Sequence, residues 1–163
     1  TLLEALRGFS GVRRRQEIRG EAGGVLVIDD FAHHPTAVRE TLAAVRERYL
    51  DRRLVAVFEP RSNSSRRNIF QSAYAEVFDP ADLVLIAEPP RMETIPPEER
   101  FSSPRLVEDL QRRNLDALFG GPAEMLLEVL LERTQPGDVV LIMSNGGFDN
   151  LHEHLLDRLR RQG

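Results

Sequence analysis

The sequence contains no cysteine and no lysine, and each absence removes a class of chemistry. Without cysteine, these residues can form no disulfide and no thiolate metal site. All 22 basic residues are arginine, so there is no phosphate-loop lysine, no Schiff-base lysine and no lysine nucleophile. If the protein uses ATP, we therefore expect residues outside this sequence to hold most of the phosphates.

Long apolar runs are also missing. No segment reaches the roughly 20 apolar residues that a membrane helix needs, and the opening TLLEALRGFSGVRRRQ lacks the apolar core of a signal peptide. The net charge of -4 argues against a nucleic-acid binder. We expect a cytoplasmic protein with neither membrane nor nucleic acid as a partner. A length of 163 residues, 41% of them hydrophobic, suits one compact domain.

Apolar strands alternate with helical patterns along most of the chain. A short helix is expected over residues 1–8, and QEIRGEAGGVLVID predicts a hairpin that turns at Gly23 and Gly24. The apolar runs RLVAVFE, ADLVLIAE, LDALF and DVVLIM predict further strands, and helices are expected over residues 35–50, 66–78, 103–113, 122–133 and 148–161. This order predicts an α/β fold with a Rossmann-like, mostly parallel sheet, helices on both faces and an N-terminal antiparallel hairpin.

The loops that follow the predicted strands carry most of the unusual residues. In parallel sheets, ligands bind at the carboxyl ends of the strands. The segments DDFAHHP (29–35), EPRSNSSRR (59–67), AEPPRMET (87–94) and MSNGG (143–147) all fall there. We therefore expect a functional site at this edge, with the proline-rich stretch 89–104 as a surface loop.

The segment DDFAHHP allows three interpretations. Its carboxylates and imidazoles suggest a metal site, but adjacent histidines point in different directions and no further ligands stand out. The same residues could instead cap a turn, with the histidines in solvent. We favour a ligand-binding turn before a helix that begins at Pro35, because the free N–H groups there suit an anionic ligand. Asp30 suits a ribose hydroxyl or a magnesium-bound water.

Arginines mark the loop 59–67. Arg61, Arg66 and Arg67 follow a predicted strand, and arginine binds carboxylates through paired N–H donors. The alternative is a solvated helix start. The arginine run 13–15 is most simply a solvated connector, although a second domain could dock there.

A glycine pair marks the last strand end. The segment 144–147 could present backbone N–H groups to an anion, and an ordinary tight turn is the equal alternative. His152 and His154 stand two positions apart in a predicted helix, so they fall on different faces.

Taken in order, these motifs resemble the C-terminal domain of the Mur ligases, the ATP-dependent amide-forming enzymes of peptidoglycan assembly. The resemblance rests on GVRRRQE, DDFAHHPTAV, FEPRSNSSRR and SNGGFDNLHE, and it extends from about Phe9 to the C-terminus. It implies that residues 1–10 are a linker helix from a central domain and that residues 11–163 are the C-terminal domain. The N-terminal and central domains would lie outside this sequence. This chain alone is then expected to be inactive and to supply no catalytic residue.

Within the family, FEPRSNSS and SNGGFDNLHE are most similar to the ligases that attach recycled tripeptide. This implies UDP-N-acetylmuramic acid and the murein tripeptide L-alanyl-γ-D-glutamyl-meso-diaminopimelate as substrates. ATP and Mg²⁺ would be held mainly by the central domain. The alternatives are the alanine-adding branch of the family, which shares the His-His-Pro turn, and a non-catalytic binding module for an acidic small molecule. A metal-dependent hydrolase ranks last, because the chain lacks a convincing ligand set.

The resemblance also implies roles for single residues. Arg15 corresponds to the linker arginine that reaches the ATP phosphates, and Asp30 to the aspartate that contacts the nucleotide ribose. Phe31 and His33 correspond to the residues that line the site of the incoming amino acid or peptide. Asp29 and His34 are expected to shape the turn. The other candidates for substrate binding are Arg61, Ser62, Asn63, Arg66, Ser144, Asn145 and Gly146.

Overall fold

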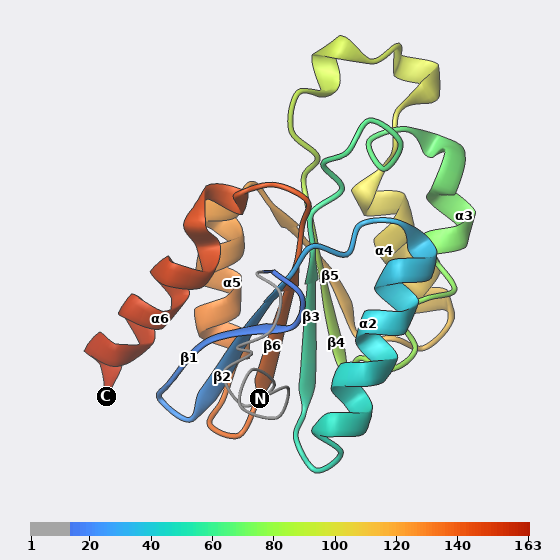
Figure 1. Cartoon of the computed structure of the whole chain (residues 1–163). Helices are drawn as coiled ribbons and strands as arrows, with labels where there is room; N and C mark the ends of the chain where they lie inside the picture. The colour runs from blue at the N-terminus through green and yellow to red at the C-terminus, as the bar shows by residue number, and fades with distance from the viewer. Residues whose placement is uncertain (1–13) are drawn as a thin grey trace, which may run out of the picture.

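A six-stranded sheet forms the middle of the molecule (Figure 1). The computed structural model describes residues 14–163, so the helix expected over residues 1–8 lies outside the described part. The strands are β1 (Glu17–Ala22), β2 (Val25–Asp30), β3 (Leu54–Phe58), β4 (Leu83–Ala87), β5 (Ala117–Gly121) and β6 (Val139–Met143). They lie in the order β1-β2-β6-β3-β4-β5, with β1 antiparallel to β2 and all other neighbours parallel. The predicted sheet and its N-terminal hairpin are confirmed.

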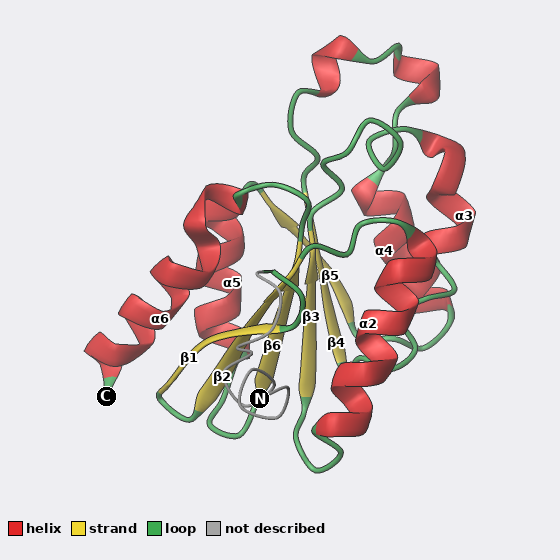
Figure 2. Cartoon of the chain, viewed as in Figure 1, coloured by secondary structure: helices red, strands yellow, loops and turns green. Residues whose placement is uncertain are grey.

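Helices cover both faces of the sheet (Figure 2). The helices α2 (Pro35–Arg48), α3 (Gln71–Tyr74) and α4 (Ser103–Arg112) pack on one face, and α5 (Ala123–Arg133) and α6 (Leu151–Gln162) on the other. Side chains of a strand alternate between faces, so Ala56 and Phe58 join the first core while Val55 and Val57 join the second. Every residue of β3 is buried, which explains why its sequence is continuously apolar rather than alternating.

The order of the strands sends the chain after β2 and the chain after β6 to opposite faces of the sheet. Because β6 lies between β2 and β3, the helix α2 crosses over β6 on one face. The helix α6, which follows β6, returns on the opposite face. Loops that leave neighbouring strands toward opposite faces diverge and leave space at the carboxyl ends, where α/β proteins bind ligands.

Local chemistry sets the turns at the two ends of β2. Gly23 and Gly24 have φ values of +57° and +75°, the left-handed region that favours glycine, and they form the predicted hairpin turn. Pro35 occupies the first turn of α2, and His34 caps that helix because its Nδ1 accepts the Thr36 N–H at 3.2 Å. The predicted helix start at Pro35 is confirmed.

The expected helix over residues 66–78 is wrong in extent. Residues Asn68–Phe70 form a 3₁₀ turn, and α3 covers only Gln71–Tyr74. The following residues are held by i to i+3 hydrogen bonds, such as Val77 N–H to the Tyr74 carbonyl at 3.3 Å. These tighter turns place Tyr74, Val77 and Phe78 all in the core, so tertiary burial overrides the helical pattern. None of the helices in residues 14–163 is both long and apolar enough to cross a membrane.

Candidate functional site

The carboxyl ends of β2, β6 and β3 lie side by side and bring three of the predicted loops together. The Ser144 N–H donates to the Asp30 carbonyl at 3.1 Å, and the Glu59 N–H donates to the Met143 carbonyl at 3.0 Å. The Ser144 hydroxyl also donates to Glu59 Oε1 at 2.6 Å. The expectation that the unusual residues share one edge of the sheet is therefore confirmed.

Asp30 anchors the turn and the connector that precedes β1. It is 5% exposed, and its carboxylate accepts the Ala32 N–H at 2.7 Å and the Gln16 N–H at 2.8 Å. Thr41 of α2 adds a longer contact at 3.4 Å. In this structure the carboxylate therefore holds protein groups, which fixes the direction in which the turn leaves β2.

Phe31 and His33 lie together at the surface of the turn. Phe31 is 45% exposed, and its ring meets the His33 ring edge-to-face, with 5.3 Å between centroids. His33 Nδ1 lies 3.0 Å from the Phe31 carbonyl. Below them, the buried Tyr74 hydroxyl donates to the His33 carbonyl. The two residues expected to contact the peptide thus form one aromatic surface supported from the core.

The flanking residues of the turn have structural partners. His34 caps α2 and packs edge-to-face on Phe70 at 4.7 Å, which confirms its predicted role in shaping the turn. Asp29 lies on the face of β2 opposite to Asp30, and its Oδ2 pairs with Arg14 Nε at 3.3 Å. Within residues 14–163, no group of three His, Cys, Asp or Glu side chains is placed to hold a metal ion.

Glu59 and Arg61 form a charged pair at the end of β3. Glu59 is 4% exposed, and burial raises the pKa of its carboxyl above 4.5, although the Ser144 hydroxyl and Arg61 act in the opposite direction. Arg61 Nη1 lies 3.6 Å from Glu59 Oε1. The Arg61 side chain packs so closely on Gly146 that a Cβ there would come within 2.2 Å of Arg61 Cδ. Because Gly146 has no side chain, it leaves the space that the Arg61 side chain occupies.

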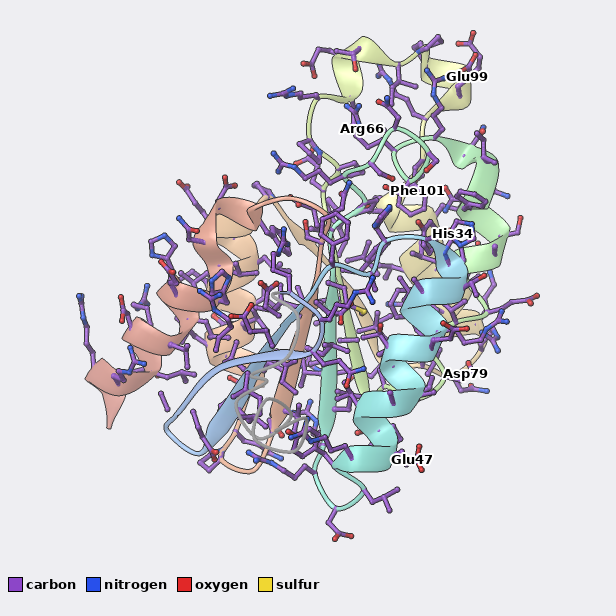
Figure 3. The ribbon with its side chains drawn as sticks, in the orientation of Figure 1. His34, Glu47, Arg66, Asp79, Glu99 and Phe101 are labelled. Carbon is purple, nitrogen blue, oxygen red and sulfur yellow. The ribbon has the colours of Figure 1, made fainter. Side chains whose placement is uncertain are left out.

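The remaining residues of the loop 59–67 bind protein groups. Ser62 Oγ donates to Ser65 Oγ at 2.7 Å, and Asn63 Oδ1 accepts from Arg66 at 2.8 Å. Arg66 also donates to the Arg91 carbonyl at 3.1 Å, and Arg67 pairs with Glu99. Figure 3 shows Arg66, Glu99 and Phe101 on the two loops that rise above the sheet. The arginines expected to form one cluster thus diverge, and the loops 59–67 and 89–101 support each other.

A cleft of about 440 Å³ opens between these loops, the start of α5 and the segment after Gly147. It is lined by both signs of charge: the carboxylates of Glu59, Glu88, Glu93 and Asp149, and the guanidinium groups of Arg61 and Arg91. A larger depression, about 610 Å³, lies between α3 and α4 and includes none of the strand-end loops. We take the smaller cleft as the candidate site, because it contains the predicted site residue Arg61 and the buried carboxylate of Glu59.

Residues 14–146 match the family described as Mur ligase, glutamate ligase domain. The chain belongs to the Mur ligase family. It is 40% identical over 159 residues to UDP-N-acetylmuramate–L-alanyl-γ-D-glutamyl-meso-2,6-diaminoheptandioate ligase of Escherichia coli, covering 97% of this chain and 33% of that protein. It is 38% identical over 164 residues to UDP-N-acetylmuramate–L-alanine ligase of Roseiflexus, covering 99% of this chain and 34% of that protein. The chain thus spans about a third of the length of these relatives.

Solved structures agree with this assignment. A murein peptide ligase from Psychrobacter arcticus matches with a TM-score of 0.79 and 33% identity, over 96% of this chain and 32% of that one. A single domain from a Haemophilus ducreyi protein, described as a ligase of the same tripeptide, matches with a TM-score of 0.67 and 31% identity. That match covers 89% of this chain and 99% of the other, so a domain of this size has been solved by itself.

Among the predicted site residues in the described part of the chain, Arg61 alone lines the cleft, and the others lie outside it. Arg15 is exposed, and its side chain makes no hydrogen bond or ion pair with another residue in the described range. Asn145 is half-buried, and its Oδ1 atom is buried without a hydrogen-bond partner among the described residues. The histidines of α6 separate as predicted, with His152 buried and His154 exposed.

Three residues that line the candidate site or support the neighbouring loops were missed from the sequence. Glu59 directly follows a buried strand and stands two positions before Arg61, a position that could have marked it. Arg14 was taken as part of a solvated run, but its guanidinium binds the carbonyls of Ser144 and Gly146. Nothing in the local sequence signals Tyr74, because its contact with His33 joins residues 41 positions apart.

Proposed function

We propose that the chain is the C-terminal domain, residues 11–163, of an ATP-dependent ligase that joins L-alanyl-γ-D-glutamyl-meso-diaminopimelate to UDP-N-acetylmuramic acid. Residues 1–10 would lead from a central domain. The reaction would serve peptidoglycan recycling in the cytoplasm. The observation that carries the proposal is the cleft of about 440 Å³ with carboxylates and guanidinium groups on its walls, a volume in the range of small-molecule sites.

The charges of this cleft suit the far end of the tripeptide. Diaminopimelate ends in an amino acid centre with an ammonium and a carboxylate. Arg61 and Arg91 can pair with carboxylates, and Glu88, Glu93 and Asp149 can accept from the ammonium. Free L-alanine would leave most of this volume empty, so the tripeptide is the better match.

The turn after β2 is suited to receive the reacting end of the acceptor. Phe31 and His33 form an aromatic surface there, with Phe31 exposed. Arg14 contacts the Phe31 ring and also binds the carbonyl of Gly146, against which Arg61 packs. ATP would activate the muramoyl carboxylate as an acyl phosphate, which the tripeptide amine attacks. The role of this domain would be to hold the amine and to close over the nucleotide, with Arg15 and Asp30 on the nucleotide side. ATP and Mg²⁺ would be held mainly by the central domain.

The test is acceptor selectivity of the full-length protein. ADP release is measured with UDP-N-acetylmuramic acid and either the tripeptide or L-alanine. We expect kcat/KM for the tripeptide to exceed that for L-alanine, and Arg61→Ala to raise KM for the tripeptide. Tripeptide binding without ADP release would instead indicate a non-catalytic module.

A second candidate is the alanine-adding ligase, favoured by the 38% identity to the Roseiflexus enzyme. In that case L-alanine would be the better acceptor in the same assay. Arg61→Ala would then affect its use no more than a distant surface variant such as Arg158→Ala, whose arginine pairs with Glu128 between α6 and α5.

A further inference from the structure

Arg14 joins the ends of two strands through its guanidinium group. Its Nη2 donates to the Ser144 carbonyl at 2.7 Å and to the Gly146 carbonyl at 2.6 Å, both beyond the end of β6. Its Nε donates to Asp29 Oδ2 at 3.3 Å, at the end of β2. The guanidinium carbon also lies 5.3 Å from the centre of the Phe31 ring. One side chain therefore contacts both the aromatic turn and the glycine loop.

The backbone of Arg14 is held as firmly as its side chain. Its carbonyl accepts the Phe31 N–H at 2.8 Å, and its N–H donates to Glu17 Oε2 at 2.9 Å. Both Arg14 and Gln16 have left-handed backbones, with φ of +57° and +48°. Such conformations cost free energy in residues other than glycine and persist where the surroundings over-determine them. The contacts of Arg14 do so here, and they set the direction of Arg15 between these two residues.

We propose that Arg14 is a positioning residue that couples the nucleotide side of the site to the acceptor side. The inference rests on the proposed function. On one side, Arg14 fixes the connector that carries Arg15. On the acceptor side, the Arg14 carbonyl accepts the Phe31 N–H, and the Arg14 guanidinium donates to the Gly146 carbonyl. Gly146 in turn packs against the Arg61 side chain. A shift at Arg14 therefore displaces groups assigned to both substrates.

The chain contains a matched control at the opposite end of the sheet. Arg52 donates to the carbonyls of Gly137 at 2.7 Å, Gly24 at 3.0 Å and Asp138 at 3.0 Å. Its side chain is 26% exposed, against 30% for Arg14. The two arginines thus make similar bonds to loop carbonyls, and only Arg14 does so beside the candidate site.

The experiment compares Arg14→Lys with Arg52→Lys in the full-length enzyme. Lysine keeps the charge, but its compact ammonium cannot reproduce the planar fork of donors. Steady-state assays give kcat and the KM values for tripeptide and ATP, and thermal unfolding gives the midpoint of each variant. We expect Arg14→Lys to raise both KM values about tenfold, which is the effect of weakening one charged hydrogen bond to each substrate. We expect Arg52→Lys to lower the unfolding midpoint while both KM values stay at wild type.

A purely structural role for Arg14 predicts a different result. Loss of folded enzyme lowers the apparent kcat and leaves both KM values unchanged, and that result for Arg14→Lys would overturn the proposal. A rise in only one of the two KM values would also overturn it, because no coupling would remain. If Arg14→Lys does not fold, Asp29→Asn removes only the ion pair; an increase of about threefold in both KM values supports the coupling and unchanged values refute it. A wild-type enzyme without ligase activity would refute the proposed function, and this inference with it.

Discussion

Replacing Gly146 by alanine isolates the contribution of Arg61 to acceptor binding. The new Cβ would lie 2.2 Å from both Cδ and Nε of Arg61. The Arg61 side chain must therefore move out of its present position. The neighbouring Gly147 offers a control, because a Cβ there has no atom within 4 Å. Gly147 also has φ of -73° and ψ of -19°, which alanine adopts readily.

The structure indicates a large effect on binding and a small one on stability. A hydrogen bond to a charged group contributes about 1.5–3 kcal/mol, and about 1.4 kcal/mol corresponds to a factor of ten. Loss of the contact between Arg61 and the tripeptide should therefore raise its KM by about ten- to a hundredfold. The ion pair with Glu59 spans 3.6 Å and Arg61 is 35% exposed, so losing it should cost no more than about 1 kcal/mol of folding stability.

The assay is steady-state ligation by the full-length enzyme, with urea unfolding of the same proteins. We expect Gly146→Ala to raise KM for the tripeptide and Gly147→Ala to leave it unchanged. The double variant Gly146→Ala with Arg61→Ala should be no worse than Arg61→Ala, since both act through one side chain. Wild-type KM in Gly146→Ala, or full additivity in the double variant, would refute this reasoning.

Three further predictions follow from other contacts. Tyr74→Phe removes the hydroxyl that donates to the His33 carbonyl. Urea unfolding should therefore show a loss of about 1–2 kcal/mol in the free energy of unfolding, and KM for the tripeptide should rise. A rise in KM no larger than that of Tyr49→Phe would argue that Tyr74 does not support the turn. Because burial raises the pKa of Glu59 above 4.5, its contribution to stability is fully present below pH 4.5 and is lost as pH rises through the folded pKa. Glu59→Gln should therefore gain stability relative to wild type as pH rises from 4.5, and a constant difference between the two unfolding curves would contradict this. The isolated chain should release no ADP from ATP with either acceptor, and measurable turnover by it would show that the chemistry needs no further domain.

The loops 59–67 and 89–101 illustrate how the site depends on distant parts of the chain. Arg66 donates to the carbonyls of Pro90 and Arg91, and the Phe101 N–H donates to the Arg66 carbonyl at 2.9 Å. These bonds hold the wall of the cleft in place. They also explain why Arg66, a candidate for substrate binding, has protein partners in this structure while Arg61 faces the cleft.

Much of the architecture followed from the sequence alone. Continuous apolar runs such as that of β3 arise because both faces of a central parallel strand are buried. The alternation of strands and helices then places the loops that follow the parallel strands at one edge, where the sequence predicts a functional site. Pro35 marked the start of α2 for an equally local reason, since its fixed φ and missing N–H suit a first helical turn.

Tertiary structure decided which of these loop residues meet and what each one holds. Arg14 and Arg15 are adjacent in sequence, but Arg15 is exposed while the guanidinium of Arg14 binds carbonyls 130 and 132 positions away. Arg61, Arg66 and Arg67 are close in sequence but turn to a cleft, a loop and a glutamate. Sequence periodicity reports which way a residue faces within its own element, because burial repeats with the period of that element. It carries no record of the distance between elements, and hydrogen bonds, ion pairs and clefts depend on that distance.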